Sequence, residues 1–249
     1  MDLAGQEHWD AVWNQQRSFP RVHRANYHHR RLGRILARWA DRGADVLDVG
    51  CAGSRWLLYC QRKLQCETWG IDYSHSGVRL ARSLVGPGAA SRILEGDFFD
   101  PALLQPASFD FIYSLGVIEH FDDGRIMTRR LAQLLRPRGV VLTAVPNFTG
   151  AYGRAQRFFD PERLAKHVIL KPGELDQLHL DAGLALEVPA AFWGCFGPAM
   201  VYYGPRLQPL FLLGARILQQ LVCNGLAAIG CDRESATWSP QIMGIYCKP

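Results

Sequence analysis

Carboxylate side chains stand at the ends of short apolar segments in the first half of the chain. The stretch "VLDVGCAGS" places Asp48 just ahead of Gly50, "GIDYS" contains Asp72, and "EGDFFD" contains Asp97. A carboxylate accepts hydroxyl or amino hydrogens at two oxygens, and a nucleoside offers both kinds of donor. A glycine turn lets the backbone approach such a ligand closely. The pattern therefore indicates a site for a nucleotide-like cofactor.

The glycine turn argues against a dinucleotide. The pyrophosphate-binding fingerprint is GxGxxG, whereas from Gly50 this chain reads "GCAGSR" and lacks the second and third glycines. Ala52 is acceptable in such a turn if its φ stays negative. Ser54 can cap the helix that follows, which glycine does less well. An NAD-dependent oxidoreductase is thus a weaker alternative than another adenosine cofactor.

From residue 45 to 147 short apolar strands alternate with amphipathic helices, which predicts parallel βαβ units. The strands are expected at "DVLDVG", "CETWGID", "SRILEGD", "FDFIYSL" and "GVVLTAV", and the helices begin near Ser54, Ser76, Pro101 and Asp122. The last of these helices is expected to be closed by "RPRG". In a doubly wound sheet of this kind the cofactor lies at the carboxyl ends of the strands.

The flanking segments predict a cap and two insertions. Residues 1–43 contain two helical patterns, one with Trp9 and Trp13, and the other with arginines on its solvated face. Residues 44–249 form the core, with substrate-side insertions near 148–171 and 193–238 and an apolar helix near 207–228. The run 188–205 is broken by prolines and glycines, so we expect no membrane partner.

The ordered stretches "LDVGCAGS", "GIDYS", "EGDFFD", "FDFIYSLGVIEHFDD" and "LLRPRGVVLTAVPN" resemble the motifs of class I S-adenosylmethionine-dependent methyltransferases. The likeness is closest to the small-molecule branch that includes the ubiquinone and menaquinone methyltransferases. It covers about residues 44–147 and, weakly, the final "SPQIMGIYCKP". It implies an α/β fold, a doubly wound Rossmann-like seven-stranded sheet with an antiparallel last strand, and S-adenosyl-L-methionine as the cofactor.

The resemblance also assigns the cofactor contacts. Asp48 organises the turn or meets the ammonium group, and the backbone at Gly50 and Gly53 faces the methionine portion. Ala52, between these glycines, is also expected to contact the cofactor. Asp72 accepts the ribose hydroxyls, and Tyr73 lies against the adenine.

At the following strand ends, Asp97 accepts the adenine amino hydrogens, with Phe98 as an apolar wall, and the backbone at Leu115 meets the ammonium group. Trp13 or Trp9 covers the sulfonium, since aromatic faces attract cations; plain core packing is the alternative.

His120, in "GVIEHF", is the candidate general base, a role that contributes about 10² to 10⁴ in rate. A structural histidine bonded to a nearby loop is the other interpretation. Alternative bases are His167, Tyr152, His28 and His29. The displacement at the sulfonium needs no metal, and we expect none.

The insertions are rich in aromatic and apolar side chains, which favours a hydrophobic or aromatic small molecule of secondary metabolism, methylated on O, N or C. Methylation of protein or nucleic acid, and a non-catalytic cofactor-binding partner protein, remain alternatives. Scattered arginines do not indicate nucleic-acid binding. The polar N-terminal stretch predicts a cytoplasmic location with reduced cysteines. A homodimer stays open.

Overall fold

The computed structural model describes residues 2–14 and 21–249. Its centre is a seven-stranded sheet in the order β3-β2-β1-β4-β5-β7-β6, in which only β7 runs antiparallel to its neighbours. The strands are β1 (Asp45–Val49), β2 (Glu67–Asp72), β3 (Ile93–Glu95), β4 (Phe109–Leu115), β5 (Leu135–Pro146), β6 (Ala185–Trp193) and β7 (Gln241–Cys247). The predicted doubly wound sheet with an antiparallel last strand is confirmed.

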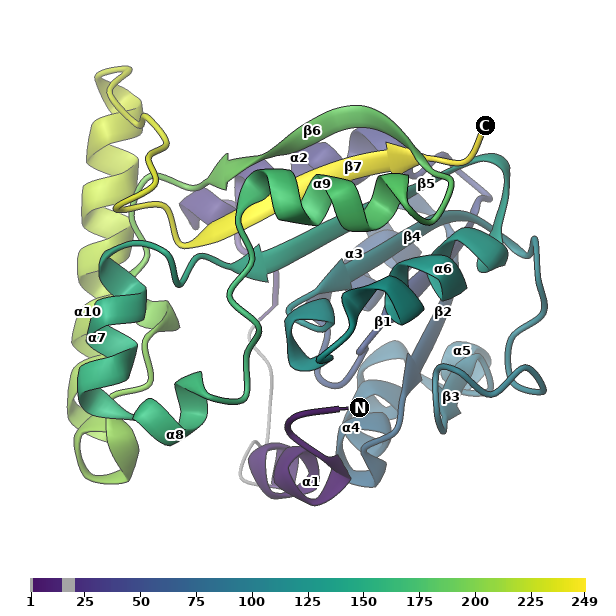
Figure 1. Ribbon diagram of the computed structural model, residues 1–249, viewed down its shortest axis with the longest axis horizontal. Helices are drawn as coiled ribbons and strands as arrows, with labels where there is room; N and C mark the ends of the chain where they lie inside the picture. The colour runs from purple at the N-terminus through teal and green to yellow at the C-terminus, as the bar shows by residue number, and fades with distance from the viewer. Residues whose placement is uncertain (1, 15–20) are drawn as a thin grey trace.

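Helices cover both faces of the sheet (Figure 1). On one face, α6 (Gly124–Leu134) and α9 (Pro172–Leu180) pack against a cluster that includes Ile112 of β4. On the other face, α2 (Tyr27–Trp39) and α3 (Arg55–Tyr59) pack against Phe111 and Tyr113 of the same strand. Because side chains alternate along a strand, the apolar stretch from Phe111 to Tyr113 contributes to both cores.

Polar caps fix where the helices after the strands begin. Ser54 caps α3 by accepting from the Trp56 amide at 3.3 Å, as the sequence predicts. A π-helical segment continues α3 over Cys60–Leu64. Ser74 caps α4 (His75–Val85), which a short α5 (Pro87–Ala90) follows, and Asp123 caps α6. These caps place the helix N-termini beside the strand ends, where a cofactor would lie.

Two expectations within the core are wrong. No helix begins at Pro101, and the loop after Asp100 forms turns instead. The Arg130 guanidinium donates hydrogen bonds to the carbonyls of Phe98, Asp100 and Leu104 and so stabilises these turns. The "RPRG" stretch does not close α6 but belongs to β5, whose first residue Leu135 pairs with Phe109 before the register shifts.

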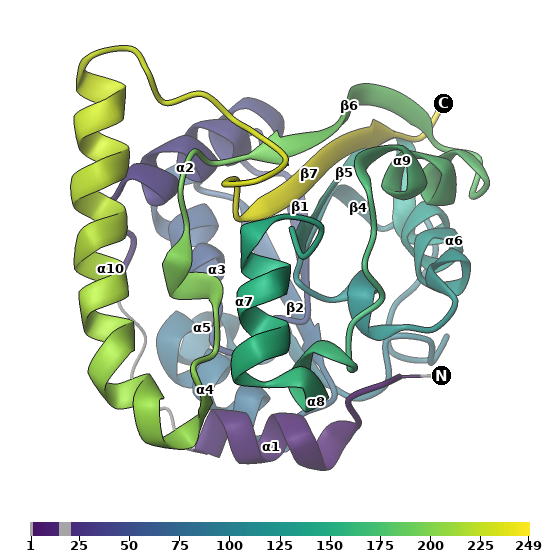
Figure 2. The same cartoon turned by 60° about the vertical axis from the view of Figure 1, so that its left-hand side comes forward.

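The remaining helices lie outside the parallel core. In Figure 2, α1 (Gln6–Asn14) runs along the lower edge and α10 (Gly204–Ala228) stands at the far left. Between β5 and β6 the chain forms α7 (Ala151–Phe159) and α8 (Pro161–Leu164) before α9. Two 3-10 turns, η2 (Ile118–His120) and η3 (Pro198–Met200), complete the set.

Candidate active site

A cavity of about 970 Å³ opens where the parallel strands end. The last residues of β1, β2, β3 and β4 all line it: Val49, Asp72, Glu95 and Leu115. This is the point at which the strand order reverses, between β1 and β4, and ligands bind there in doubly wound folds. Leu115 thus lies in the wall where the sequence placed it.

The Asp72 carboxylate is held at both oxygens. Its Oδ2 accepts from the Ala52 amide at 3.1 Å, and its Oδ1 accepts from the Ser74 amide at 2.8 Å. Burial raises the pKa of Asp72 to about 6. Each carboxylate oxygen keeps a further lone pair for a second donor, so the group is oriented in advance for two hydroxyls.

The glycine turn needs its glycine at Gly50. The residue has φ +76°, and an added Cβ would stand 2.5 Å from Val117 Cγ2. Ala52, by contrast, is not among the described residues with positive φ. Its methyl group has room because Gly77 faces it from α4; a Cβ on Gly77 would lie 2.4 Å from the Ala52 Cβ. The departure from the glycine pattern is therefore compensated inside the fold.

Asp48 lies beneath the turn rather than in the cavity wall. It is only 2% exposed, and burial raises its pKa to about 7. Its Oδ2 has no hydrogen-bond partner among the described residues. Because Asp48 does not line the cavity, this placement argues against direct contact with an ammonium group there.

Tyr73, Asp97 and Phe98 all line the cavity, as expected. The Tyr73 hydroxyl donates to the Asp2 carboxylate, and Gln6 Nε2 donates to the Tyr73 carbonyl at 2.8 Å. The Asp97 Oδ1 accepts from the Phe99 amide at 2.9 Å. The sequence reasoning missed the N-terminal pair, since no local pattern connects residues so far from Tyr73.

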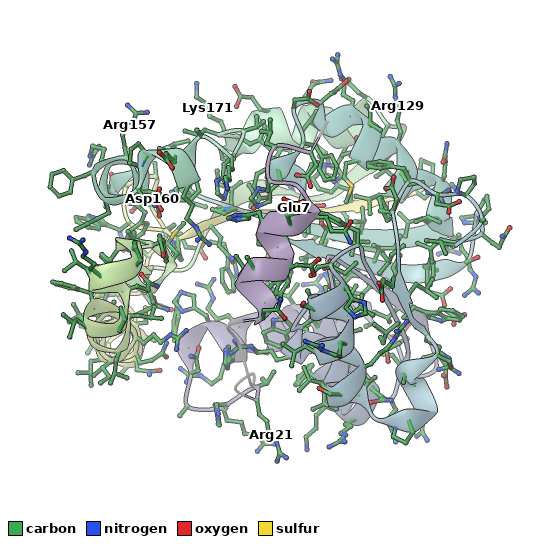
Figure 3. All side chains as sticks on the ribbon, turned by 90° about the horizontal axis from the view of Figure 1, so that it is seen from below. Glu7, Arg21, Arg129, Arg157, Asp160 and Lys171 are labelled. Carbon is green, nitrogen blue, oxygen red and sulfur yellow. The ribbon has the colours of Figure 1, made fainter. Side chains whose placement is uncertain are left out.

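The short helix α1 closes the cavity from the N-terminal side. Trp9 and Trp13 both line it, stacked with ring centroids 6.2 Å apart. The helix is fastened by Asp10, which accepts from Ser74 Oγ at 2.7 Å and from the Ser76 amide at 3.0 Å. Figure 3 shows α1, labelled at Glu7, across the middle of the lower face. An aromatic lid is thus tied to the start of α4, and Asp10 is a third residue that sequence reasoning missed.

His120 lies in the cavity wall against this lid. Its ring meets Trp9 edge to face at 5.0 Å. Its Nδ1 lies 2.9 Å from the Lys166 carbonyl; because a carbonyl only accepts, Nδ1 carries the proton and Nε2 is left with its lone pair. Burial, together with the neighbouring His167, lowers the pKa of His120 to about 4. The imidazole is therefore neutral near pH 7.

His120 belongs to a buried group of three. One potential metal-ligand atom from each of Glu119, His120 and His167 lies within 4.8 Å of the other two. Among the described residues, this is the group whose geometry could hold a metal ion. His167 Nδ1 is bonded to the Arg163 carbonyl at 2.8 Å, so its Nε2 is also free to accept. As an alternative to binding a metal ion, the Nε2 atoms of His120 and His167 beside the Glu119 carboxyl group can accept a proton.

The other candidate bases lie elsewhere. The Tyr152 hydroxyl accepts from the Gly197 amide at 2.7 Å. His28 packs against Trp193, and His29 contacts Arg55 at 2.7 Å. None of the three candidates lines the cavity. The structure therefore leaves His120, supported by His167, as the histidine next to the cofactor position.

Known proteins match this chain in sequence and fold. Residues 22–187 match the family described as a methyltransferase domain. A ubiquinone biosynthesis O-methyltransferase of Xanthomonas euvesicatoria pv. vesicatoria is 30% identical over 167 residues, covering 63% of this chain and 69% of that protein. The chain belongs to the class I S-adenosylmethionine-dependent methyltransferases, and S-adenosylmethionine is its cofactor.

Two further matches define the limits of the likeness. The protein of the same name from Xanthomonas campestris pv. campestris is 34% identical over 126 residues, which cover 49% of this chain, and the chain spans about half (51%) of that relative's length. A chain from the complex between the Haloferax volcanii Trm112 methyltransferase activator and a methyltransferase has a TM-score of 0.65 at 18% identity, covering 100% of this chain and 99% of that one. The latter likeness shows the fold alone.

Proposed function

We propose that this chain methylates a hydroxyl oxygen of a hydrophobic, aromatic small molecule of secondary metabolism, with S-adenosylmethionine as the donor. The observation that supports oxygen is His120, a neutral imidazole that lines the cavity and whose Nε2, 4.0 Å from Glu119 Oε1, carries no proton. A hydroxyl must lose its proton during transfer, and a neutral imidazole can accept it. The curated relatives are named as O-methyltransferases, which agrees with this choice.

In the proposed reaction a lone pair of the acceptor oxygen attacks the methyl carbon in line with the sulfur. The carbon–sulfur bond breaks, its electron pair stays on sulfur, and S-adenosylhomocysteine leaves. The hydroxyl proton passes to His120 Nε2. The chain's own contribution is alignment, which can supply about 7 to 11 kcal/mol. Asp72 and Tyr73 would hold the nucleoside while Trp9 and His120 flank the acceptor side.

The walls of the cavity support an apolar acceptor. Val117, Phe99, Phe121, Ile126 and Met127 all line it, and the two phenylalanine rings meet edge to face at 5.5 Å. Next to the carboxylates at the strand ends, this apolar part of the wall suits a hydrophobic small molecule.

An acceptor panel tests the proposal. Purified protein is incubated with S-adenosylmethionine and matched aromatic compounds that carry a hydroxyl, an amine, or a methyl ether in place of the hydroxyl. We expect the hydroxyl compound to gain one methyl group per S-adenosylhomocysteine formed, as measured by mass spectrometry. Methylation of the amine or of ring carbon in place of the hydroxyl would contradict the assignment to oxygen, and cofactor binding without any S-adenosylhomocysteine would contradict methyl transfer.

A further inference from the structure

Helix α10 presents an apolar face to its surroundings. In both ribbon views it stands at the margin of the molecule (Figures 1 and 2). It is the one helix in the described part of the chain that is long and apolar enough to cross a membrane by length and composition. Its exposed large side chains are Leu207, Leu210, Phe211, Leu213, Ile217, Leu218 and Leu221, with Ile229 just beyond its end. None of them lines the cofactor cavity.

The polar side chains of α10 point the other way. Gln219 accepts from the Ala199 amide at 3.2 Å, and Gln220 accepts from the Tyr27 amide at 2.9 Å. Asn224 accepts from Arg30 at 2.8 Å and donates to a backbone carbonyl of the segment before α2. A surface helix in water has the opposite arrangement, with its apolar stripe facing the core. The inward bonds also keep α10 docked on the body, so it lies along a surface instead of crossing a bilayer.

The charged side chains on α10 itself have one sign. The 25 residues of α10 contain no acidic side chain, and its charged residues are Arg206 and Arg216, both exposed. Arg216 borders a shallow apolar groove together with Ile217 and Leu221. A second copy pairing through this face would bring these arginines together with no carboxylate on the helix to balance them. An anionic lipid surface supplies the missing charge.

Aromatic side chains flank the helix at both ends. Phe158 is 82% exposed and touches Phe159, which contacts Tyr203 just before the helix. Near the other end, Trp238 is 52% exposed and packs on Phe196, whose carbonyl accepts from the Cys223 thiol of α10. Aromatic rings of this kind concentrate at the boundary between lipid and water.

We infer that the outer face of α10 binds an anionic membrane surface, with the helix lying in the interface and its apolar side chains inserted among the lipids. This replaces the expectation of no membrane partner, which rested on the run 188–205 and not on the helix that follows it. The inference is independent of methyl transfer, because α10 contributes nothing to the cavity wall.

Vesicle sedimentation tests the inference. The protein is mixed with vesicles of phosphatidylcholine alone or of phosphatidylcholine with phosphatidylglycerol. We expect sedimentation mainly with the anionic vesicles. The double variant Leu210→Glu/Leu213→Glu should lower the partition coefficient at least about tenfold. The matched control is Leu186→Glu/Val188→Glu on β6, which changes two side chains that are each 42% exposed and should leave partitioning unchanged.

A second variant separates charge from apolar insertion. Arg206→Gln/Arg216→Gln should lower binding to anionic vesicles at least about tenfold and leave the weak binding to neutral vesicles unchanged. Every variant is first checked for wild-type affinity for S-adenosylhomocysteine, which reports an intact fold. No sedimentation of the wild type with either vesicle would overturn the inference. So would a dimer in light scattering that Leu210→Glu/Leu213→Glu dissociates, since α10 would then be covered by a second copy.

Discussion

The cofactor cavity and helix α10 orient their polar side chains in opposite directions. At the carboxyl ends of the strands, Asp72 and Asp97 point toward the cavity and are oriented by backbone amides. On α10 the polar side chains of Gln220 and Asn224 turn inward to the protein, while leucines face out. The first arrangement suits a small polar ligand, and the second suits an apolar surface. In the proposed account, cofactor binding and surface recognition are therefore built into separate parts of one fold.

The largest effect is expected at His120. His120→Asn should lower kcat about 100-fold or more, because the acceptor proton loses its base, while affinity for S-adenosylhomocysteine stays at the wild-type value. Initial rates and calorimetry measure the two quantities. His23→Asn, at an exposed histidine away from the cavity, is the control.

A wild-type rate for His120→Asn would remove the residue from the reaction. Treatment with a chelator distinguishes a base from a metal site in the Glu119–His120–His167 group. We expect no change in rate with a chelator. A loss that added divalent cation reverses would assign the group to metal binding.

The next effect is at the cofactor end. Asp72→Asn should weaken S-adenosylhomocysteine binding more than about tenfold, since the amide can no longer accept two ribose hydroxyls through both of its terminal atoms. Isothermal titration calorimetry measures the dissociation constant. Asp181→Asn, at the exposed end of α9, should bind as the wild type does. Equal affinity in Asp72→Asn would show that the ribose lies elsewhere.

A steric prediction concerns the turn itself. Gly77→Ala should lower the free energy of unfolding by about 1 to 3 kcal/mol, because its Cβ would stand 2.4 Å from that of Ala52. Ala52→Gly in the same chain should restore part of the loss. Urea denaturation measures both, and Gly173→Ala, which meets nothing within 4 Å, is the control. A double variant no more stable than Gly77→Ala would mean that this contact is not the cause.

The smallest effect is a pH dependence of cofactor affinity. Burial raises the pKa of Asp72 to about 6, so the carboxylate is ionised above that pH and takes up a proton below it. Only the ionised form accepts at both oxygens, and affinity for S-adenosylhomocysteine should therefore fall severalfold as the pH drops from about 7 to about 5. Calorimetry across this range checks the trend. The trend should be absent in Asp72→Asn, and a variant that keeps it would assign the titration to another group.

The strand-end part of the cavity wall was predictable because its residues lie at a strand end or within a few residues of one. Asp72 and Tyr73 come directly after β2, so a short motif contains both the position and the chemistry. The partners of these residues could not be found in the same way. Asp2 is 71 residues from Tyr73, and the Lys166 carbonyl is 46 residues from His120. Such pairs depend on how the chain returns across the cavity, which local patterns do not record.

The wrong expectation of a helix at Pro101 and the unpredicted orientation of α10 have the same origin. Pro101 has the local features of a helix start. However, Arg130 of α6 donates hydrogen bonds to the carbonyls of this loop and stabilises its turns. For α10 the sequence predicts an apolar helix correctly. Its periodicity does not tell which face meets the body, because that depends on contacts such as the hydrogen bond that Gln220 accepts from the Tyr27 amide at the start of α2. Tertiary contacts decided both cases.

A crystal structure with S-adenosylhomocysteine tests the central claim most directly. The account predicts the ligand in the cavity at the ends of β1 to β4, with its ribose hydroxyls on Asp72 and its sulfur facing the side that Trp9 and His120 flank. A ligand bound elsewhere, or one whose sulfur points away from His120, would contradict the account.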